Sequence, residues 1–482
     1  MSRSKKNHQS GNSAPRRSFI RNAALIASGI TIVPRFVLGG KGFIPPSDTF
    51  YAAGIGVGGK GEVDMKGIGD CKNARVIALC DVDDKSAEKS VKRFPGATYY
   101  KDWRIMLDKE GKNLDGVSVT TPDHMHAHPA LRAMSMGKHV YVQKPLTHNI
   151  YEARLLTRAA EKYKVVTQMG NQGGSGDDVR TVKEWVDAGM IGDVTRVHSW
   201  TNRPVWPQGL PTPKGKFDTP KELDWDLWIG CADFVDYNPA YHPFNWRGWW
   251  PYGTGALGDM ACHILDPFFR ILPVKYASDV ECSASTIWSD FFVEADYPDS
   301  CPPSSIIHFT FPRTDGKGDI RLTWMDGGLR PERPLELLPD EEMGDVDGGL
   351  IMEGTKGKII TGMWGRKPRL LPSSRMKTET FPPETIPRIP KGVDGHYANW
   401  VDAAMAGYGK GVPSSPFNYS GPFTEAILLG NVALRAYQIK GGKGYPGRKK
   451  LLWDAENMKV TNFDEANQFV KRTYRKGWEL VG

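Results

Sequence analysis

Long apolar runs are missing from this sequence. No stretch of 18 or more apolar residues occurs among its 482, which argues against a membrane-spanning helix in its body. None of the six cysteines belongs to a C-x-x-C pair, so zinc sites and thioredoxin-type redox sites have no support. Internal repeats and long low-complexity segments are also absent. The composition, 40% hydrophobic and 24% charged, is that of a globular protein, and the length predicts two packed units.

The body of the protein also lacks net charge. The first 41 residues hold eight Lys and Arg and no acid, which accounts for the whole formal net charge of +8. Without this leader the chain has no net basic charge that would favour nucleic acid, so no nucleic-acid partner is expected.

The leader itself has a recognisable pattern. Residues 15–21 read Pro-Arg-Arg-Ser-Phe-Ile-Arg, and a short apolar run over 23–33 follows. A twin-arginine pair before a short apolar segment is typical of an export signal rather than a membrane span. We therefore interpret residues 1–47 as signal and linker, and expect a periplasmic or otherwise exported protein. This pathway carries folded proteins, which suits an enzyme that acquires a cofactor in the cytoplasm.

Short apolar strands alternate with helical segments from residue 49 onward. Strands are predicted over 50–55, 75–80, 116–120, 139–142 and 165–169, and helices over 84–93, 129–136 and 150–163. This alternation predicts parallel βαβ units and an α/β domain over 48–174.

The pattern changes after residue 174. A helix over 178–188 and a strand over 194–201 precede a loop rich in Pro, Gly and Trp that runs to about residue 250. Strands over 304–311 and 319–324 and helices over 396–405 and 423–439 follow. We predict a second α/β domain over 175–482, with a mostly antiparallel open sheet, C-terminal helices and a tail, for substrate binding and oligomerisation.

Glycines crowd the turn after the first predicted strand. The segment Gly54-Ile55-Gly56-Val57-Gly58-Gly59 matches G-x-G-x-x-G, and we expect it to bind a dinucleotide in a Rossmann domain. Gly54 permits the tight turn, Gly56 lets the backbone approach the pyrophosphate, and Gly59 allows close packing of helix on strand. The N-terminus of the following helix then offers N–H groups to the phosphates.

An acid ends the second predicted strand. Asp81 is expected to accept hydrogen bonds from the adenosine ribose and to repel a 2′-phosphate, so NAD is preferred over NADP. Lys60 and Lys85 oppose that preference.

Three later motifs follow in a fixed order. Residues 120–126 read Thr-Thr-Pro-Asp-His-Met-His, Gln143-Lys144-Pro145 follows the fourth predicted strand, and residues 253–263 read Gly-Thr-Gly-Ala-Leu-Gly-Asp-Met-Ala-Cys-His. Together they resemble the T-P-x-x-x-H, Glu-Lys-Pro and G-G-x-x-x-D-x-x-x-H motifs of the Gfo/Idh/MocA family of glucose–fructose oxidoreductase and inositol dehydrogenase. The resemblance covers roughly residues 48–280. It implies that Lys144, Asp259 and His263 are catalytic, and that Thr121, Pro122, His126, Gln143 and Lys144 contact the cofactor.

The chemistry of these residues supports the same assignment. Oxidation of a secondary alcohol requires a base for the hydroxyl proton while a hydride leaves for nicotinamide. His263 has a suitable reference pKa of ~6.5, and Asp259 lies four residues before it, on the same helical face. Lys144 follows a parallel strand, where α/β ligands bind, and can hold the reacting oxygen. Gln143 departs from the family's glutamate and removes a carboxylate from this region.

Three histidines, His124, His126 and His128, invite a metal interpretation. No carboxylate or cysteine completes a known ligand spacing, so no metal is expected. We expect His126 on the nicotinamide side of the cleft.

Tryptophan is concentrated in the long loop, where seven of the 15 Trp lie between residues 200 and 250. Each of them taken singly is more often a core residue, but indole rings also stack on sugars, and the cluster beside the catalytic segment favours a carbohydrate substrate. The candidate substrate-binding residues are Asn171, Gln172, Tyr241, His242, Trp246 and Arg247.

We therefore expect an NAD(H)-dependent oxidoreductase acting on a secondary hydroxyl of a sugar, glycoside or polyol. Free NAD is not expected outside the cytoplasm, so the cofactor should be tightly held and recycled in place. Two alternatives stay open: an NAD-using glycoside hydrolase that resembles family 109, and a sugar-binding protein that retains NAD without turnover. The family resemblance also implies a homo-oligomer.

Overall fold

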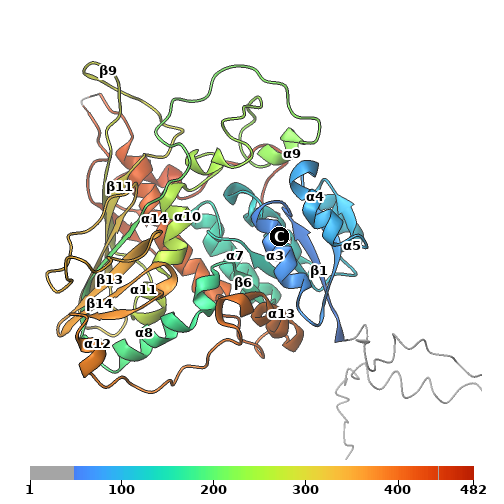
Figure 1. Ribbon diagram of the computed structural model, residues 1–482. Coiled ribbons are helices and arrows are strands. Elements are labelled where there is room, and N and C mark those ends of the chain that lie inside the picture. The colour runs from blue at the N-terminus through green and yellow to red at the C-terminus, as the bar shows by residue number, and fades with distance from the viewer. Residues whose placement is uncertain (1–47, 443, 482) are drawn as a thin grey trace, which may run out of the picture. The chain divides into compact units, whose positions relative to one another are not determined.

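Two β-sheets organise the chain, and the first contains only strands that precede residue 170 (Figure 1). The computed structural model describes residues 48–442 and 444–481. The proposed export signal over residues 1–47 therefore lies outside the described residues. Within the described ranges, no helix is both long enough and apolar enough to cross a membrane.

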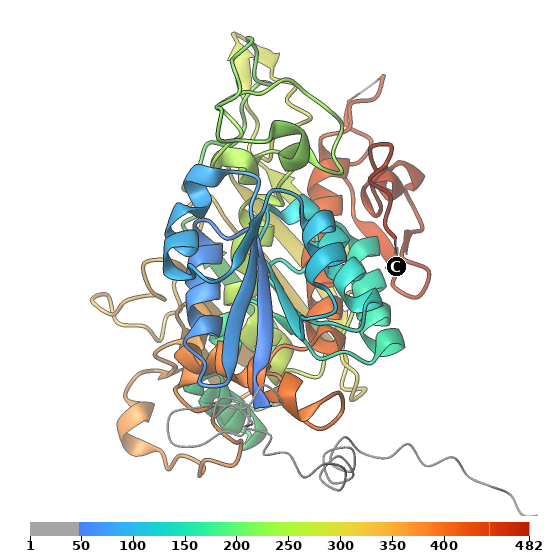
Figure 2. The ribbon, with the colours of Figure 1, turned by 90° about the vertical axis from the view of Figure 1, so that its right-hand side faces the viewer.

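The first sheet has six strands, and all of its neighbouring pairs run parallel. Its order is β3 (Thr98–Tyr100), β2 (Ala74–Cys80), β1 (Phe50–Ile55), β4 (Gly116–Val119), β5 (His139–Val142), β6 (Thr167–Met169). The segments between and after these strands contain α3 (Lys60–Gly69), α4 (Asp84–Arg93), α5 (Trp103–Glu110), η2 (Asp123–Met125), α6 (Ala127–Ser135), α7 (Ile150–Tyr163) and η3 (Gln172–Ser175). Helices flank both faces of this sheet in Figure 2. The predicted Rossmann domain is confirmed.

Local signals explain where two of these helices begin. The Asp83 carboxylate accepts a hydrogen bond from Lys85 N at 3.0 Å at the start of α4. The Asn149 side chain accepts one from Glu152 N at 3.0 Å at the start of α7. Such caps satisfy N–H groups that have no partner inside the helix. Both helices keep the bounds that the sequence predicted.

The second sheet has nine strands and is mostly antiparallel, as predicted. Its order is β15 (Arg369–Leu371), β14 (Gly357–Thr361), β13 (Gly348–Gly354), β7 (Val194–Thr201), β12 (Asp319–Met325), β11 (Ser305–Pro312), β8 (Asp279–Ala284), β16 (Leu451–Asp454), β17 (Lys459–Val460). Strands β7 and β12 pair in parallel. Helices α10 (Gly255–Ile264), α11 (Asp266–Ile271) and α14 (Phe417–Tyr437) lie on one face of this sheet in Figure 1.

Shorter elements complete the second half. They are α8 (Asp177–Asp187), α9 (Trp225–Ile229), η4 (Asn245–Gly248), β9 (Trp288–Asp290), β10 (Val293–Glu294), η5 (Met363–Gly365), α12 (Arg375–Thr378), η6 (Gly392–Gly395), α13 (His396–Ala406) and η7 (Asp464–Phe469). The sequence predicted α8, α13 and α14 but missed most of the short strands.

Helix α13 completes the core of the first sheet, although it comes from the C-terminal part of the chain. Trp400 is fully buried, and its ring meets that of Phe50 edge-on at 5.3 Å. Tyr397 and Val401 join the same apolar cluster. Residues from Phe50 onward accordingly form one compact unit. The domain boundary at residue 174 stays a prediction.

A buried ion pair links the two halves. Arg154 of α7 donates to Glu425 of α14 through two hydrogen bonds of 2.7 and 2.6 Å, and the Glu425 side chain is 2% exposed. We expect Arg154→Met to lower the free energy of unfolding by about 3–5 kcal/mol, because it leaves a buried carboxylate without its partner. The measurement is a urea titration.

The double variant Arg154→Met/Glu425→Met should recover most of this loss, since no buried charge remains unpaired. Lys183→Met is the control: its pair with Asp187 is exposed, and its loss should cost less than about 1 kcal/mol. A single variant as stable as the wild type would show that the pair does not hold the halves together.

Candidate active site

A large cavity lies at the edge of the first sheet where its strands end. Its volume is about 1490 Å³, and its lining runs from Gly56, Gly58 and Asp81 to Lys144 and His263. Ligands of open α/β sheets bind at this edge. The volume exceeds the roughly 300–1,000 Å³ of ordinary small-molecule sites, which suits a dinucleotide together with a second ligand.

The glycine turn fits a dinucleotide phosphate. Gly56 has a φ of 73°, and a Cβ at this position would lie 2.6 Å from Thr120 O. Gly59 has a φ of 53° and begins α3 without a side-chain cap. The first N–H groups of α3 are thus not capped by a side chain of the turn and can face a phosphate.

Close packing of helix on strand depends on other glycines than expected. A Cβ on Gly59 would meet nothing within 4 Å, so the packing role predicted for this residue is wrong. A Cβ on Gly61 would lie 1.9 Å from Gly56 O, and one on Gly54 would lie 2.5 Å from the sulfur of Met65. Gly54 and Gly61 therefore let α3 approach β1.

Asp81 holds the glycine turn in shape. Its Oδ2 accepts from Val57 N at 2.8 Å and from Gly58 N at 3.0 Å, and its Oδ1 accepts from Asp83 N. Burial raises the pKa of this carboxyl, while the three N–H donors oppose the shift. A carboxylate has about four acceptor sites, so one remains for a ribose hydroxyl. Lys60, which was expected to weaken the preference for NAD, is instead paired with Asp64.

The structure brings the three predicted catalytic residues to one end of the cavity. Lys144, at the end of β5, donates to Asp259 Oδ1 at 2.7 Å and to Asp259 O at 2.8 Å. Asp259 and His263 lie on α10, one turn apart, and both line the cavity with Lys144. The Lys144–Pro145 peptide is cis.

Electrostatics at this end favour a charged Asp259 and a neutral His263. Burial would raise the pKa of Asp259, but Lys144 and Arg247 outweigh it and lower this pKa to about 2. Burial lowers the pKa of His263 well below its ordinary value, and the Lys144 charge lowers it further. His263 Nδ1 is buried without a hydrogen-bond partner.

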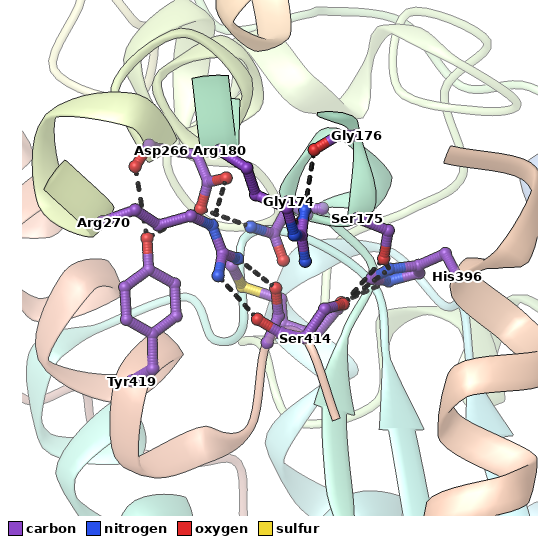
Figure 3. A network of polar contacts seen from close by, with 12 residues as sticks. Gly174, Ser175, Gly176, Arg180, Asp266, Arg270, His396, Ser414 and Tyr419 are labelled. Atoms are coloured by element: carbon purple, nitrogen blue, oxygen red, sulfur yellow. Dashed lines mark hydrogen bonds and ion pairs between the residues drawn. The ribbon is translucent and has the colours of Figure 1, made fainter. Parts of the chain in front are cut away.

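A buried polar network fixes the helix that follows His263 (Figure 3). Asp266 accepts from Asn171 Nδ2 at 2.8 Å, from Tyr419 OH at 2.7 Å and from Arg270 Nε at 2.8 Å. Arg270 also donates to Ser414 O at 2.7 Å. The network thus ties α11 to the end of β6 and to α14. Because α11 directly follows α10, these contacts also anchor the C-terminal end of α10.

Two residues predicted to bind substrate do not line the cavity. Asn171 is fully buried, because its amide donates to Asp266 in the network above. Tyr241 is 7% exposed and packs edge-on against Trp249 and Tyr252 at 5.3 and 5.1 Å. Gln172, His242, Trp246 and Arg247 do line it. Of these, His242 lies 3.3 Å from Asp83, at the end of the cavity that holds Asp81.

Of the residues predicted to bind the cofactor, most line the cavity and two do not. Gly54 and Val57 lie behind the cavity wall, whereas Gly56, Gly58, Gly59, Asp81, Thr121, Pro122, His126, Gln143 and Lys144 line it. His126 nevertheless has both nitrogens 2.8 Å from carbonyl oxygens, those of Pro145 and Thr121. It therefore joins the loops after β4 and β5.

The histidine triplet forms no metal site. His124 Nε2 lies 3.2 Å from Trp228 O, and His128 Nε2 lies 2.8 Å from Trp478 O. In the part of the chain that the structure describes, no group of three or more His, Cys, Asp or Glu could hold a metal ion.

The tryptophan cluster is mostly core. All seven Trp between residues 200 and 250 are less than 9% exposed, and of these only Trp228 and Trp246 line the cavity. The sequence missed Trp364, whose ring lies 5.6 Å from that of His263. Its φ of 65° is unusual for a residue with a bulky side chain. Such strain is often found at functional sites, but it leaves no signal in the sequence.

Asp123 and Tyr397 are further lining residues that the sequence missed. Asp123 is buried, which raises the pKa of its carboxyl, and accepts from Thr254 Oγ1 at 2.6 Å. Asp123 lies within the 120–126 motif that the sequence analysis identified, so the motif could have indicated it as a lining residue. Tyr397 reaches the cavity from α13, more than 300 residues after the glycine turn, and no motif in the sequence indicated it.

The chain matches two models of one protein family. Residues 51–171 match the model described as oxidoreductase family, NAD-binding Rossmann fold, and residues 175–290 match that described as oxidoreductase family, C-terminal alpha/beta domain. The two matches follow one another along the chain, as the two sheets do.

Individual relatives share a low sequence identity with this chain. Levoglucosan dehydrogenase of Pseudarthrobacter phenanthrenivorans is 23% identical over 286 residues, which cover 58% of this chain and 52% of that protein. A glycosyl hydrolase family 109 protein of Shewanella pealeana is 26% identical over 205 residues, which cover 37% of this chain and 44% of that protein. The chain thus spans about half the length of these curated relatives.

A solved structure of levoglucosan dehydrogenase in complex with NADH shares the fold. It has a TM-score of 0.54 at 17% identity and covers 81% of this chain and 98% of its own. Residues 51–290 of this chain, apart from three residues between the two matches, thus resemble both domains of the Gfo/Idh/MocA oxidoreductase family in their order.

Proposed function

We propose that this protein is an NAD(H)-dependent oxidoreductase that acts on a secondary hydroxyl of a sugar, glycoside or polyol. The observation that carries the proposal is the convergence of Lys144, Asp259 and His263 in the cavity that also holds the glycine turn. The names of relatives, levoglucosan dehydrogenase and inositol 2-dehydrogenase, support a sugar or polyol substrate.

The side chains of this cavity can perform the proton chemistry. NAD, when bound, supplies the acceptor for the hydride that leaves the carbinol carbon. Lys144 donates to the carbinol oxygen and stabilises the negative charge that develops there. His263, kept neutral by burial, accepts the hydroxyl proton, and Asp259 holds Lys144 in position through the 2.7 Å ion pair.

The loop over residues 202–250 supports a tightly held cofactor. It crosses the end of β2, where Asp84 N donates to Glu222 O at 3.1 Å and Asp224 N donates to Val82 O at 2.9 Å. Trp228 from this loop lines the cavity together with the glycine turn. In Figure 2 the loop, in green, lies above the first sheet. A cofactor in the cavity would therefore contact both parts of the chain.

The C-terminal tail, residues 471–481, holds this loop from outside. Arg475 N donates to Cys231 O at 3.0 Å, and the Arg475 guanidinium pairs with Asp226 at 2.7 Å. The Trp478 ring lies 4.3 Å from the Arg104 guanidinium of α5. The tail thus connects the loop to the nucleotide-binding half.

Export and assembly belong to the same proposal. The twin-arginine pattern of residues 15–21 supports a periplasmic or otherwise exported enzyme, in which a retained cofactor must be recycled in place. A homo-oligomer, which the family resemblance implies, is part of the same proposal. Strand β11 alternates buried residues with less buried ones, so the face of the second sheet opposite α10 and α14 is the surface to examine for it.

A second candidate function is that of a glycoside hydrolase that works by oxidation, elimination, water addition and reduction. The similarity to a family 109 protein favours it. A panel of glycosides followed by mass spectrometry separates the two, since a hydrolase releases the aglycone and a dehydrogenase yields a keto sugar. A protein that only retains NAD would leave the absorbance near ~340 nm unchanged by every glycoside.

Replacing the central lysine should abolish chemistry. Lys144→Met is expected to reduce kcat by about 10²-fold or more while NADH still binds, because the carbinol oxygen loses its charged donor. Single-turnover absorbance and NADH titration measure the two effects. Lys183→Met, which removes an exposed ion pair with Asp187 away from the cavity, is the control and should behave as the wild type. Normal turnover by the Lys144 variant would refute the assignment.

The buried imidazole of His263 should determine how kcat/KM depends on pH. The pKa of His263 is lowered, so it keeps its proton-accepting lone pair well below pH ~6.5, and kcat/KM should stay flat from about pH 8 to 6. Trp364→Ala exposes one face of His263 to water and should move the acidic limb upward. A wild-type limb centred near ~6.5 would contradict the neutral, buried base.

Weakening the tail should loosen the cofactor. Arg475→Glu places a negative charge beside Asp226, and we expect NADH to dissociate roughly three- to tenfold faster, equivalent to about 1 kcal/mol. Chasing bound NADH with excess NAD and following its fluorescence measures this rate. Arg448→Glu, whose partner Glu294 belongs to neither segment, is the control. Equal rates in all three proteins would mean that the tail does not retain the cofactor.

A further inference from the structure

A buried carboxylate that belongs to none of the recognised motifs lies beneath the cavity. Asp64, on α3, is 0% exposed. It accepts from Tyr397 OH at 2.8 Å, Thr120 Oγ1 at 2.9 Å and Gln143 Nε2 at 2.8 Å, and it pairs with Lys60 one turn earlier. Four donors match the acceptor capacity of an ionised carboxylate.

These donors come from four different elements. Lys60 lies on α3, Thr120 follows β4, Gln143 follows β5, and Tyr397 lies on α13. Asp64 is therefore the point where the glycine-turn helix, two strand ends and the C-terminal helix meet. A charge buried this deeply is tolerated only because all of them donate to it.

The carboxylate sets the orientation of Gln143. An ionised carboxylate has no hydrogen to donate, so the amide nitrogen must face Asp64, and Gln143 Oε1 then accepts from Lys144 N at 3.2 Å. Gly170 leaves room for this amide, since a Cβ there would lie 2.5 Å from Gln143 Nε2. Asp64 thereby acts on the backbone that carries Lys144.

We propose that Asp64 is a positioning residue for the cofactor site, acting through Gln143, and that this pair requires one carboxylate and one amide. The inference rests on the proposed NAD-dependent function. It explains the departure from Glu-Lys-Pro: a glutamate at position 143 would put a second carboxylate within hydrogen-bond distance of Asp64, and the two would have to share a proton.

The groups around the pair define its pH behaviour. Lys60 and Tyr397 face Asp64 directly, Tyr141 of β5 lies beside Tyr397, and the Lys144 ammonium is already paired with Asp259. Burial raises the pKa of Tyr397, and the Asp64 charge raises it further, so this phenol stays protonated. A new carboxylate at 143 would therefore have the carboxylate of Asp64 as its nearest acidic neighbour.

The test is NADH titration of the full-length protein, followed by fluorescence at pH 5.5 and 8.5. The wild type should bind equally at both values. Gln143→Glu should bind about tenfold more weakly at pH 8.5 than at pH 5.5, because both carboxylates ionise there. Gln468→Glu, which adds the same charge away from the cavity, is the control and should follow the wild type.

Exchanging the two groups supplies the second arm. Asp64→Asn keeps the side-chain shape and should weaken NADH binding about tenfold at both pH values. The double variant Asp64→Asn/Gln143→Glu restores one carboxylate and one amide, and should return to within about threefold of the wild type without pH dependence. This comparison does not require Gln143→Glu to fold by itself. It needs only the NADH affinities of Asp64→Asn and of the double variant, and a higher affinity of the double variant supports the coupling.

The outcomes separate the two proposals. If the losses of the single variants add in the double variant, or if Gln143→Glu binds like the wild type at both pH values, the Asp64–Gln143 coupling is refuted. If the wild type itself binds no NADH, the proposed function fails. If the wild type binds NADH and oxidises a sugar while every variant binds alike, this inference alone fails.

Discussion

The ion pair between Lys144 and Asp259 is the constraint on which the site depends. It connects the end of a strand in the parallel sheet to a helix that packs on the second sheet. Taking two charges out of water costs several kcal/mol per ion, so such a pair persists only with further polar contacts. Arg247, 3.7 Å from Asp259, and the Lys144 bond to the Asp259 carbonyl provide them. His263, one turn later on the same helix, is thereby brought beside the lysine.

Three segments that follow the first sheet in the sequence pack against the nucleotide-binding part of the chain. The loop over 202–250 pairs with the end of β2, α13 completes the core of the first sheet, and the tail packs on the loop. Each segment comes from the C-terminal half but contributes to the nucleotide-binding half. A dinucleotide in this cavity would contact both parts of the chain.

Local sequence predicted much of the fold because its signals are short-ranged. Short apolar segments predicted most strands of the first sheet. The structure shows side-chain caps at Asp83 and Asn149, which begin α4 and α7 where the sequence placed these helices. Strand β3, with three residues, is too short for such a pattern. The roles of single glycines were less predictable: Gly59 and Gly61 are two residues apart, and only the path of α3 over β1 decides which of them a Cβ would obstruct.

The sequence by itself determined the order of the longer elements and the dinucleotide turn with Asp81. Through the family resemblance it also proposed Lys144, Asp259 and His263 as catalytic, and helical periodicity places the last two on one face. The tertiary structure alone decided which side chains reach the cavity. Asn171 and Tyr241 turned out to be internal, whereas Trp364, Tyr397 and Asp64 became part of the site or its support. The reason is physical: most of these side chains are buried or bonded by partners far along the chain, such as Asp266 for Asn171 and Tyr397 for Asp64, and no local pattern encodes those partners.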